Sequence, residues 1–259
     1  MRQARHADAV PPAEGAGRCV PPSVGGDRRV YAIGDIHGRD DLFAQLLDRI
    51  ALDEAERDPL PRLLVLLGDL VDRGPQSRQV VERAMGLARS TGDVRFLKGN
   101  HEEMFIAAAR GKAQAARLFR RYGGVETLAS YGLGAEDSAL MSDEAMARWM
   151  LAHVPRDHVD FLDDFADMLP LGDYLFVHAG VRPRVALDAQ IPADLRWIRG
   201  DFLNHGRHFG KMIVHGHSIS EDVDVQPNRI GIDTGAFRSG RLTAIGLEKD
   251  RRWFLQTSA

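Results

Sequence analysis

Residues 65–74 read VLLGDLVDRG, an apolar run that stops abruptly at two carboxylates and an arginine between glycines. A buried parallel strand is a short run of this kind, and open α/β sheets place their ligands beyond the carboxyl ends of their strands. We therefore expect Asp69 at the edge of a cleft.

The same arrangement occurs at two neighbouring places in the chain. Residues 30–33 (VYAI) run into GDIHG at 34–38, and residues 94–97 (VRFL) lead to GNHE at 99–102. One such ending would be a turn, because Gly and Asp are default turn residues. Three successive endings that carry metal-type ligands indicate a single shared site.

Helical segments separate these apolar runs. Residues 40–50 read as an amphipathic helix with acidic residues in its first turn, and residues 75–89 as a helix that opens with proline. The resulting β-α-β-α-β order predicts a parallel sheet with covering helices. The composition then becomes rich in Ala, Met, Arg and Leu, which predicts a helical insertion at about residues 103–170.

The last third of the chain returns to short apolar runs separated by turn residues. They lie at residues 174–177, 212–214, 230–233 and 242–247. Such spacing is typical of an antiparallel second sheet. We therefore expect an α/β (α+β) fold in which two mixed β-sheets pack as a sandwich, flanked by helices.

Composition limits the class of protein. Residues 1–28 are rich in Pro and Gly and lack the apolar core of a secretory signal, so we interpret them as a disordered tail before one catalytic domain at 29–259. A net charge of −3 implies no general attraction to nucleic acid or to an anionic membrane, and neither is predicted as a partner. The single cysteine, Cys19, excludes an internal disulfide framework and indicates a cytoplasmic protein.

The three blocks GDIHG, GDLVDRG and GNHE are followed by HAG at 178–180 and HGHS at 215–218. In this order they resemble the calcineurin-like metallophosphoesterases, and within them the phosphoprotein phosphatase family, over about residues 29–247. The resemblance implies the metallophosphoesterase fold. HAG and HGHS, in place of the HGG and RAH usual in eukaryotic members, indicate a bacterial-type enzyme.

The resemblance also implies a pair of divalent metal ions with one shared carboxylate. By position in the family blocks, one ion takes Asp35 and His37, Asp69 bridges, and the other ion takes Asn100, His178 and His217. Alternate residues at a strand end point the same way, so the first two side chains can reach one ion. Oxygen and nitrogen ligands without thiolate permit Mn²⁺, Fe or Zn²⁺, and the family makes Mn²⁺ the first choice.

Two histidines in the HGHS block compete for the last ligand position. The wider superfamily often has GH-x-H there, and its final histidine adds a ligand to the first metal. That place is Ile219 in this chain, so the resemblance assigns His217 as the ligand. His215 is then structural or lies behind the ligands.

The family pattern further supplies residues for catalysis. His101 occupies the place of the general acid, and Asp72 is the partner that fixes its tautomer and raises its pKa. Arg73 offers a planar fork to phosphate oxygens. Arg199 is the candidate for a second phosphate-binding arginine, with Arg196 as the alternative, and Asn100 also faces the substrate.

The resulting prediction is a metal-dependent phosphomonoesterase, a serine/threonine protein phosphatase that acts by direct attack of a dimetal-bound hydroxide on phosphorus. Its partner would be a phosphorylated protein or a small phosphoester. The alternative is a hydrolase of diadenosine tetraphosphate, whose family shares these blocks. Adenine recognition calls for aromatic platforms, and a chain with 7% aromatic residues offers few beyond Trp197 and Tyr122. A scaffold without catalysis would lack a ligand or the acid, and none is missing.

Overall fold

The computed structural model describes residues 21–91 and 93–258 and contains two five-stranded sheets. The first has the order β10-β9-β1-β2-β3, in which β1, β2 and β3 are parallel and β9 and β10 are antiparallel to their neighbours. Its strands are β1 (Arg29–Ile33), β2 (Arg62–Leu66), β3 (Val94–Phe96), β9 (Thr243–Glu248) and β10 (Arg251–Gln256). The three parallel strands are the three runs that the sequence indicated.

The second sheet has the order β4-β5-β6-β8-β7. Its strands are β4 (Met168–Leu171), β5 (Tyr174–Val177), β6 (Met212–His215), β7 (Asp224–Val225) and β8 (Arg229–Gly231). The expectation of an antiparallel second sheet was wrong, because β5, β6 and β8 are parallel and only the outer strands run antiparallel. A parallel pair needs a crossover of a dozen or more residues, and the segment between β5 and β6 is long enough to provide one.

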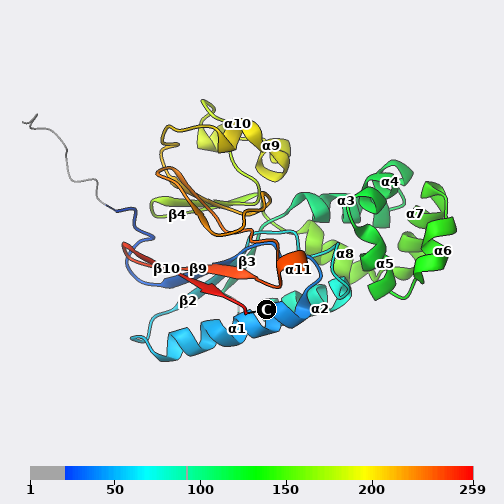
Figure 1. The fold of residues 1–259 in the computed structure, drawn as a ribbon, viewed down its shortest axis with the longest axis horizontal. Helices are drawn as coiled ribbons and strands as arrows, with labels where there is room; N and C mark the ends of the chain where they lie inside the picture. Colours follow the sequence, from blue (N-terminus) through cyan, green and yellow to red (C-terminus); the bar gives the residue numbers. More distant parts are fainter. Residues whose placement is uncertain (1–20, 92, 259) are drawn as a thin grey trace, which may run out of the picture.

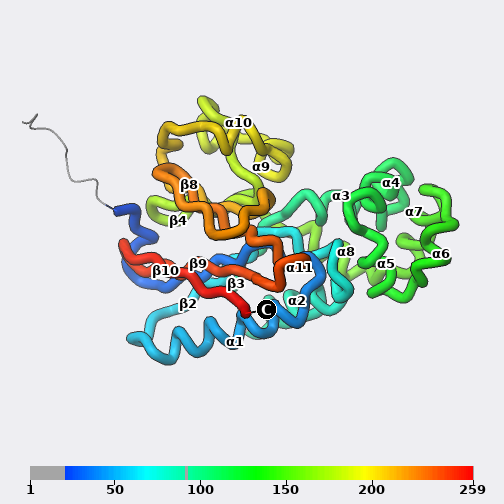
Figure 2. The backbone as a smooth tube through the Cα atoms, in the orientation of Figure 1, coloured from blue at the N-terminus to red at the C-terminus, as the bar shows by residue number. Residues whose placement is uncertain are grey.

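The strand predicted at 242–247 belongs to the first sheet. As β9 it pairs antiparallel with β1, with Ile33 opposite Ala244 and Arg29 opposite Glu248. Figure 2 shows the red C-terminal strands beside the blue N-terminal strand. Strand β10 was not anticipated. Local sequence cannot say which sheet such a run joins, because its partners lie about 200 residues away in the chain.

Alternation along the strands divides the core into layers. Val30 and Ala32 of β1 face the second sheet and share one buried cluster with Phe176 and Val214. Tyr31 faces the opposite way, into the cluster formed with the covering helices, because successive strand residues point to opposite faces. The predicted sandwich of two mixed sheets flanked by helices is confirmed.

Helices cover both outer faces of the sandwich (Figure 1). Helices α1 (Asp40–Ala55) and α2 (Ser77–Thr91) pack on the first sheet. Helices α9 (Pro192–Trp197) and α10 (Gly200–Leu203), which follow the short η1 (Leu187–Ala189), lie against the second sheet, and Phe202 is fully buried there. Helix α11 (Ala236–Ser239) follows β8.

The helical insertion lies to one side of the sandwich (Figure 1). It consists of α3 (Asn100–Ala109), α4 (Ala113–Arg121), α5 (Gly124–Ser130), α6 (Ala135–Leu140), α7 (Asp143–His153) and α8 (Arg156–Asp163). Phe105 and Phe119 are fully buried in the cluster that also contains the outer face of the first sheet. The insertion is therefore packed onto the first sheet.

The tail predicted at residues 1–28 includes residues that make ordered contacts with the domain. Residues 1–20 lie outside the described part of the chain, but Val24 is buried, and its amide donates to the carbonyl of Lys249 at 2.9 Å. The carbonyl of Ser23 accepts from the amide of Asp173 at 2.7 Å. These residues belong to the domain.

Cys19 also lies outside the described residues, so the cytoplasmic location stays a prediction. Among the described helices, none combines the length and the apolarity needed to cross a membrane.

Asp53 of α1 joins the helix to two strands of the first sheet, β1 and β10. Its carboxylate accepts hydrogen bonds from Tyr31 of β1, from Arg57 at 2.8 Å and from the indole of Trp253 on β10 at 3.0 Å. Partial burial alone would raise the pKa of Asp53, but the bonds from Arg57 and Tyr31 outweigh it and hold the pKa below its usual value.

Replacing Asp53 with asparagine is expected to lower the free energy of unfolding at pH 7 by about 1.5–3 kcal/mol, the range for hydrogen bonds to a charged group. A carboxylate with a depressed pKa stabilises the fold above its unfolded pKa of about 3.9, and this contribution is lost as the pH falls through the folded value. The difference between variant and wild type should therefore shrink below about pH 4. Urea unfolding from pH 7 to pH 3 measures this difference in the free energy of unfolding. The control is Asp48→Asn, at an exposed position on the same helix. A difference that stays constant with pH would contradict this assignment.

Candidate metal centre

Parallel pairing places the first two ligand loops side by side. Ile33 at the end of β1 is opposite Leu66 at the end of β2, so the chains that carry Asp35 and Asp69 leave the sheet together. The amides of Ile36 and His37 both donate to the carbonyl of Asp69, at 3.1 and 2.8 Å. The loop geometry that the strand endings predicted is therefore present.

The loops are held in an uncommon backbone conformation. Non-glycine residues with positive φ include His37 (47°), Asp69 (53°), Asp72 (73°), Arg73 (70°) and His217 (62°). Such residues cost of order 1–3 kcal/mol each and cluster at functional sites. All five were candidate site residues from the sequence alone.

Two glycines in the motifs allow carboxylates to approach the backbone. A Cβ on Gly99 would lie 2.1 Å from Oδ1 of Asp69, and a Cβ on Gly216 would lie 2.0 Å from Oδ1 of Asp35. Any side chain there would displace a predicted ligand. This contact explains the glycine in the GNHE and HGHS blocks.

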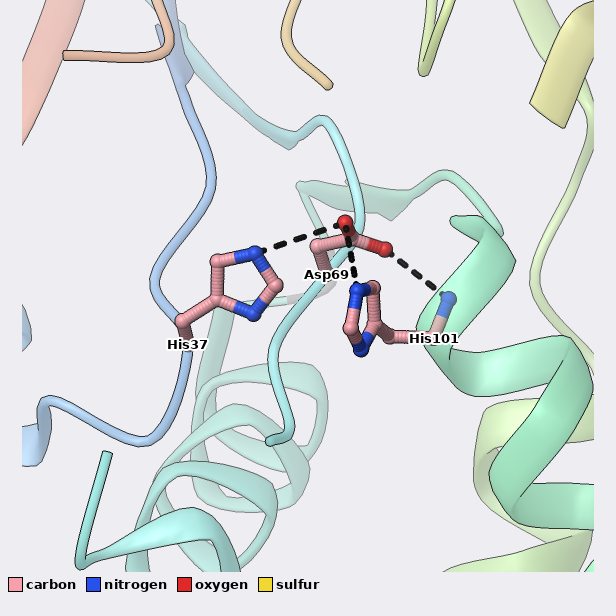
Figure 3. Close-up of side chains that lie close together, drawn as sticks. All are labelled: His37, Asp69 and His101. Carbon is pink, nitrogen blue, oxygen red and sulfur yellow. Dashed lines mark hydrogen bonds and ion pairs between the residues drawn. The ribbon is translucent and has the colours of Figure 1, made fainter. Parts of the chain in front are cut away.

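His37, Asp69 and His101 form the first group (Figure 3). Nδ1 of His37 lies 2.9 Å from the carbonyl of Val71, which can only accept, so Nδ1 carries the ring proton. Nε2 is buried without a hydrogen-bond partner, 3.5 Å from Asp69 and 4.0 Å from Asp35. Burial and the neighbouring His101 lower the pKa of His37 well below its usual value. A neutral imidazole nitrogen facing two carboxylates is suited to a cation.

The second group is centred on His178. Its Nδ1 lies 2.8 Å from the carbonyl of Leu67, and its Nε2 is 3.1 Å from Oδ1 of Asn100, 3.2 Å from Nδ1 of His217 and 3.4 Å from Oδ1 of Asp69. Asp69 thus faces both groups, as a shared carboxylate must.

The electrostatics of the second group favour a positive charge within it. Burial lowers the pKa of His178, but the carboxylates of Asp69, Asp35 and Glu102 together outweigh burial and raise the pKa to about 10. Burial and the neighbouring His178 lower the pKa of His217 to about 2. Either a proton on His178 or a cation between these atoms would balance the negative charge of Asp69. The buried Nε2 of His217 has no hydrogen-bond partner. The residues therefore fit a metal centre.

Asp35 completes the set of predicted ligands. Its two carboxylate oxygens accept from the amide of His217 at 3.1 and 3.0 Å, which joins strand ends of the two sheets. Burial, and then the carboxylate of Asp233, raise the pKa of Asp35 well above its usual value. A nearby cation would stabilise the ionised form of this carboxyl group and so lower its pKa.

His101 lies close to Asp69 in Figure 3, but both its ring nitrogens have other partners. Nδ1 is 2.7 Å from Asp72, and Nε2 is 2.9 Å from Nη2 of Arg73. Since a guanidinium only donates, Nε2 accepts that bond and Nδ1 holds the ring proton toward Asp72. Burial lowers the pKa of His101, but Asp69 and Asp72 outweigh burial and raise it.

Thr127 fixes Asp72 from the helical insertion. Its hydroxyl donates to Oδ1 of Asp72 at 2.7 Å, and the amide of Asp72 lies 2.9 Å from the same hydroxyl oxygen. The carboxylate that holds His101 is therefore positioned by α5, which connects the insertion to the site.

The two candidate arginines differ in their partners. Arg196 donates to Asp167 at 2.7 Å and to Glu103 at 3.2 Å, and its side chain is 15% exposed. Arg199 is exposed and lies 3.4 Å from the hydroxyl of Ser218, next to His217. Arg199 is therefore the one available to a substrate.

His215 lies outside both groups. Its ring packs edge-on against Phe202 at 5.0 Å, and its Nδ1 lies 3.0 Å from the carbonyl of Gly216. Burial lowers its pKa to about 4. These contacts agree with the structural role expected of it.

Two buried acids were not assigned a role from the sequence. Glu102 accepts from the amides of Asp69 and Leu70 at 2.8 and 2.7 Å, and so holds the loop of the shared carboxylate. The charge of Asp233 raises the pKa of Asp35. The Oδ2 atom of Asp233 is buried without a hydrogen-bond partner. Asp233 directly follows the apolar run at 230–232, so a related signal, an acid at the end of a strand, could have found it.

The family model of the calcineurin-like phosphoesterases matches residues 28–235. The chain belongs to this family. The predicted resemblance is thereby confirmed.

Curated relatives with similar sequences are named as hydrolases of dinucleoside tetraphosphates. The symmetrical bis(5′-nucleosyl)-tetraphosphatase of Paracidovorax citrulli is 35% identical over 162 residues, which cover 62% of this chain and 48% of the relative. The asymmetrical bis(5′-nucleosyl)-tetraphosphatase PrpE of Anoxybacillus flavithermus is 26% identical, over 82% of this chain and 88% of the relative. The chain spans about half the length of the symmetrical relatives it matches. These names agree with the alternative prediction better than with the protein phosphatase.

Solved structures share the fold. A protein proposed to be a diadenosine tetraphosphatase superposes with a TM-score of 0.59 at 19% identity, over 93% of this chain and 96% of that one. A cold-active protein tyrosine phosphatase gives a TM-score of 0.55 at 20% identity, over 89% and 79%. At such identities the likeness concerns architecture alone.

Proposed function

We propose that this chain hydrolyses bis(5′-nucleosyl) polyphosphates such as diadenosine tetraphosphate. The observation that supports phosphoester hydrolysis is the position of Asp69 in both metal-binding groups, with Arg73 and His101 beside them. The preference for a dinucleotide over a phosphoprotein is supported by the names of the curated relatives.

Two divalent cations are part of the proposal, with Mn²⁺ as first choice and Fe or Zn²⁺ as alternatives. When bound, such a pair activates water and polarises a phosphoryl oxygen. The residues that would hold it are Asp35 and His37 on one side, Asp69 between, and Asn100, His178 and His217 on the other.

The chain's own side chains then bind and orient the substrate. Arg73 offers its guanidinium to the oxygens of the scissile phosphoryl group, and the exposed Arg199, beside Ser218, offers a second. His101, held by Asp72 through Nδ1, acts as the imidazolium: Arg73 turns from Nε2 to the phosphoryl oxygens, and the protonated Nε2 donates to the oxygen that departs from phosphorus. The products are two nucleotides, and the bond that breaks is a phosphoanhydride.

Serine/threonine phosphate hydrolysis remains the second candidate, and the raised pKa of His101 favours it. An alkoxide leaving group needs a proton in the transition state, and a histidine that keeps its proton can provide one. A nucleotide leaving group is a weaker base and needs this proton less.

A substrate panel separates the two functions. With Mn²⁺ bound, we expect kcat/KM for diadenosine tetraphosphate to exceed that for a phosphoserine peptide by at least about tenfold, a difference of about 1.4 kcal/mol in transition-state binding. Anion-exchange chromatography of the products tells which anhydride is cut, since two ADP or one ATP with one AMP are formed. Faster turnover of the phosphopeptide would overturn the proposed function.

A further inference from the structure

We propose that the ring of Tyr122 is the platform on which a nucleobase of the substrate stacks, on the side of the site where the leaving group departs. The inference rests on the proposed function and names the residue that would recognise the base.

Aromatic rings form a continuous series through the site. Phe237 of α11 contacts His37 edge-on at 5.6 Å, His37 contacts His101 at 4.6 Å, and His101 contacts Tyr122 at 6.4 Å between ring centroids. Tyr122 ends this series next to the proposed general acid. A leaving group that takes its proton from His101 therefore departs beside this ring.

Tyr122 is open to solvent. It is 39% exposed, and among the exposed large apolar side chains of the described residues it is the aromatic one. The other candidate from the sequence, Trp197, is less available, because its indole donates to Glu103 at 3.3 Å and its ring packs against the cluster of the helical insertion. The structure thus separates the two aromatic candidates.

The backbone fixes Tyr122 relative to the phosphate-binding arginine. The carbonyl of the next residue, Gly123, accepts from the amide of Arg73 at 2.8 Å. Gly123 has φ of 98°, and a Cβ there would lie 2.8 Å from Cγ of Arg73. A glycine is required for this approach, and it places the tyrosine next to the arginine although the two lie about 50 residues apart in the chain.

The chemistry around the ring matches a nucleotide. Arg73 supplies a cation for phosphate on one side, and the guanidinium of Arg121 lies 5.9 Å from the centroid of the Tyr122 ring. Arg121 is exposed at the end of α4, where it can meet the charge of a polyphosphate. Stacking on an aromatic side chain tolerates any base, so the ring would accept a nucleoside polyphosphate without selecting its base.

Binding without turnover tests the inference. The probe is 1,N⁶-ethenoadenosine diphosphate, whose fluorescence reports stacking, titrated into Mn²⁺-loaded protein. Tyr122→Leu is expected to bind it about tenfold more weakly than wild type, within the range for loss of one base–aromatic stack. Tyr122→Phe, which keeps the ring, should stay within about twofold of wild type. Circular dichroism establishes that each variant is folded.

Two further measurements make the result specific to the base. Inorganic pyrophosphate, which has no base, should compete equally well in wild type and Tyr122→Leu. Trp149→Leu removes a ring that stacks on His153 of α7, away from the metal-binding groups, and should bind the probe like wild type. Unchanged probe binding in Tyr122→Leu, or an equal loss for pyrophosphate, would overturn the inference. Failure of the proposed function appears separately, as slow hydrolysis of diadenosine tetraphosphate by wild type.

Discussion

Replacing Asp69 with asparagine is expected to remove bound metal and activity together. The substitution keeps the shape of the side chain, and the amide oxygen can still accept from the amide of His101, which now lies 3.1 Å from Oδ1. It deletes the one negative charge that faces both His37 and His178. Loss of an outer partner of a metal ligand typically costs 10–100-fold in affinity, so loss of a shared ligand should cost at least about 10²-fold.

Metal content by mass spectrometry, together with kcat for the best substrate of the panel, measures this effect. Asp160→Asn on α8 is the matched control, because that carboxylate is 58% exposed and pairs only with surface arginines among the described residues. The control should keep full metal and full activity. An Asp69→Asn protein that retains two equivalents of metal and normal turnover would remove Asp69 from the centre of the site.

The strand endings were predictable because the signal is local. An apolar run that meets Gly and then a ligand is contained in about ten residues, and parallel pairing brings such endings to one edge. The roles of these residues came from the family resemblance, and their convergence in space followed from the sheet. This part of the site needed no knowledge of distant contacts.

The parts that could not be predicted depend on contacts distant in sequence. Arg196 and Arg199 are three residues apart and chemically identical, and ion pairs of Arg196 with Glu103 and Asp167 distinguish them. The direction of β6 depends on its register with β5 and β8. Neither the partners of Arg196 nor the direction of β6 can be predicted from the residues that flank them in the sequence.

Glu102 shows a different limit. An acid in the first turn of a helix is explained by the helix dipole alone, so its position in GNHE did not indicate a further role. In the fold it is fully buried and accepts from the amides of Gly99, Asp69 and Leu70 at 2.9, 2.8 and 2.7 Å. A local explanation that is sufficient can conceal a tertiary one.

Replacing His101 with asparagine should reveal which leaving group the site serves. On a phosphoserine peptide, whose alkoxide is a strong base, we expect kcat to fall by about 10²–10⁴-fold, the usual effect of losing a general acid. On diadenosine tetraphosphate the loss should be smaller, because the departing phosphate has a pKa of about 6 and leaves without full protonation.

Metal should remain bound in His101→Asn, since both ring nitrogens of His101 already have partners in Asp72 and Arg73. The same preparation is assayed on both substrates and for metal content, so that a metal defect is not mistaken for a catalytic one. Equal losses on the two substrates would mean that His101 acts on bound phosphate and does not protonate the leaving oxygen. Loss of metal would instead make it a ligand, in the group that it forms with His37 and Asp69.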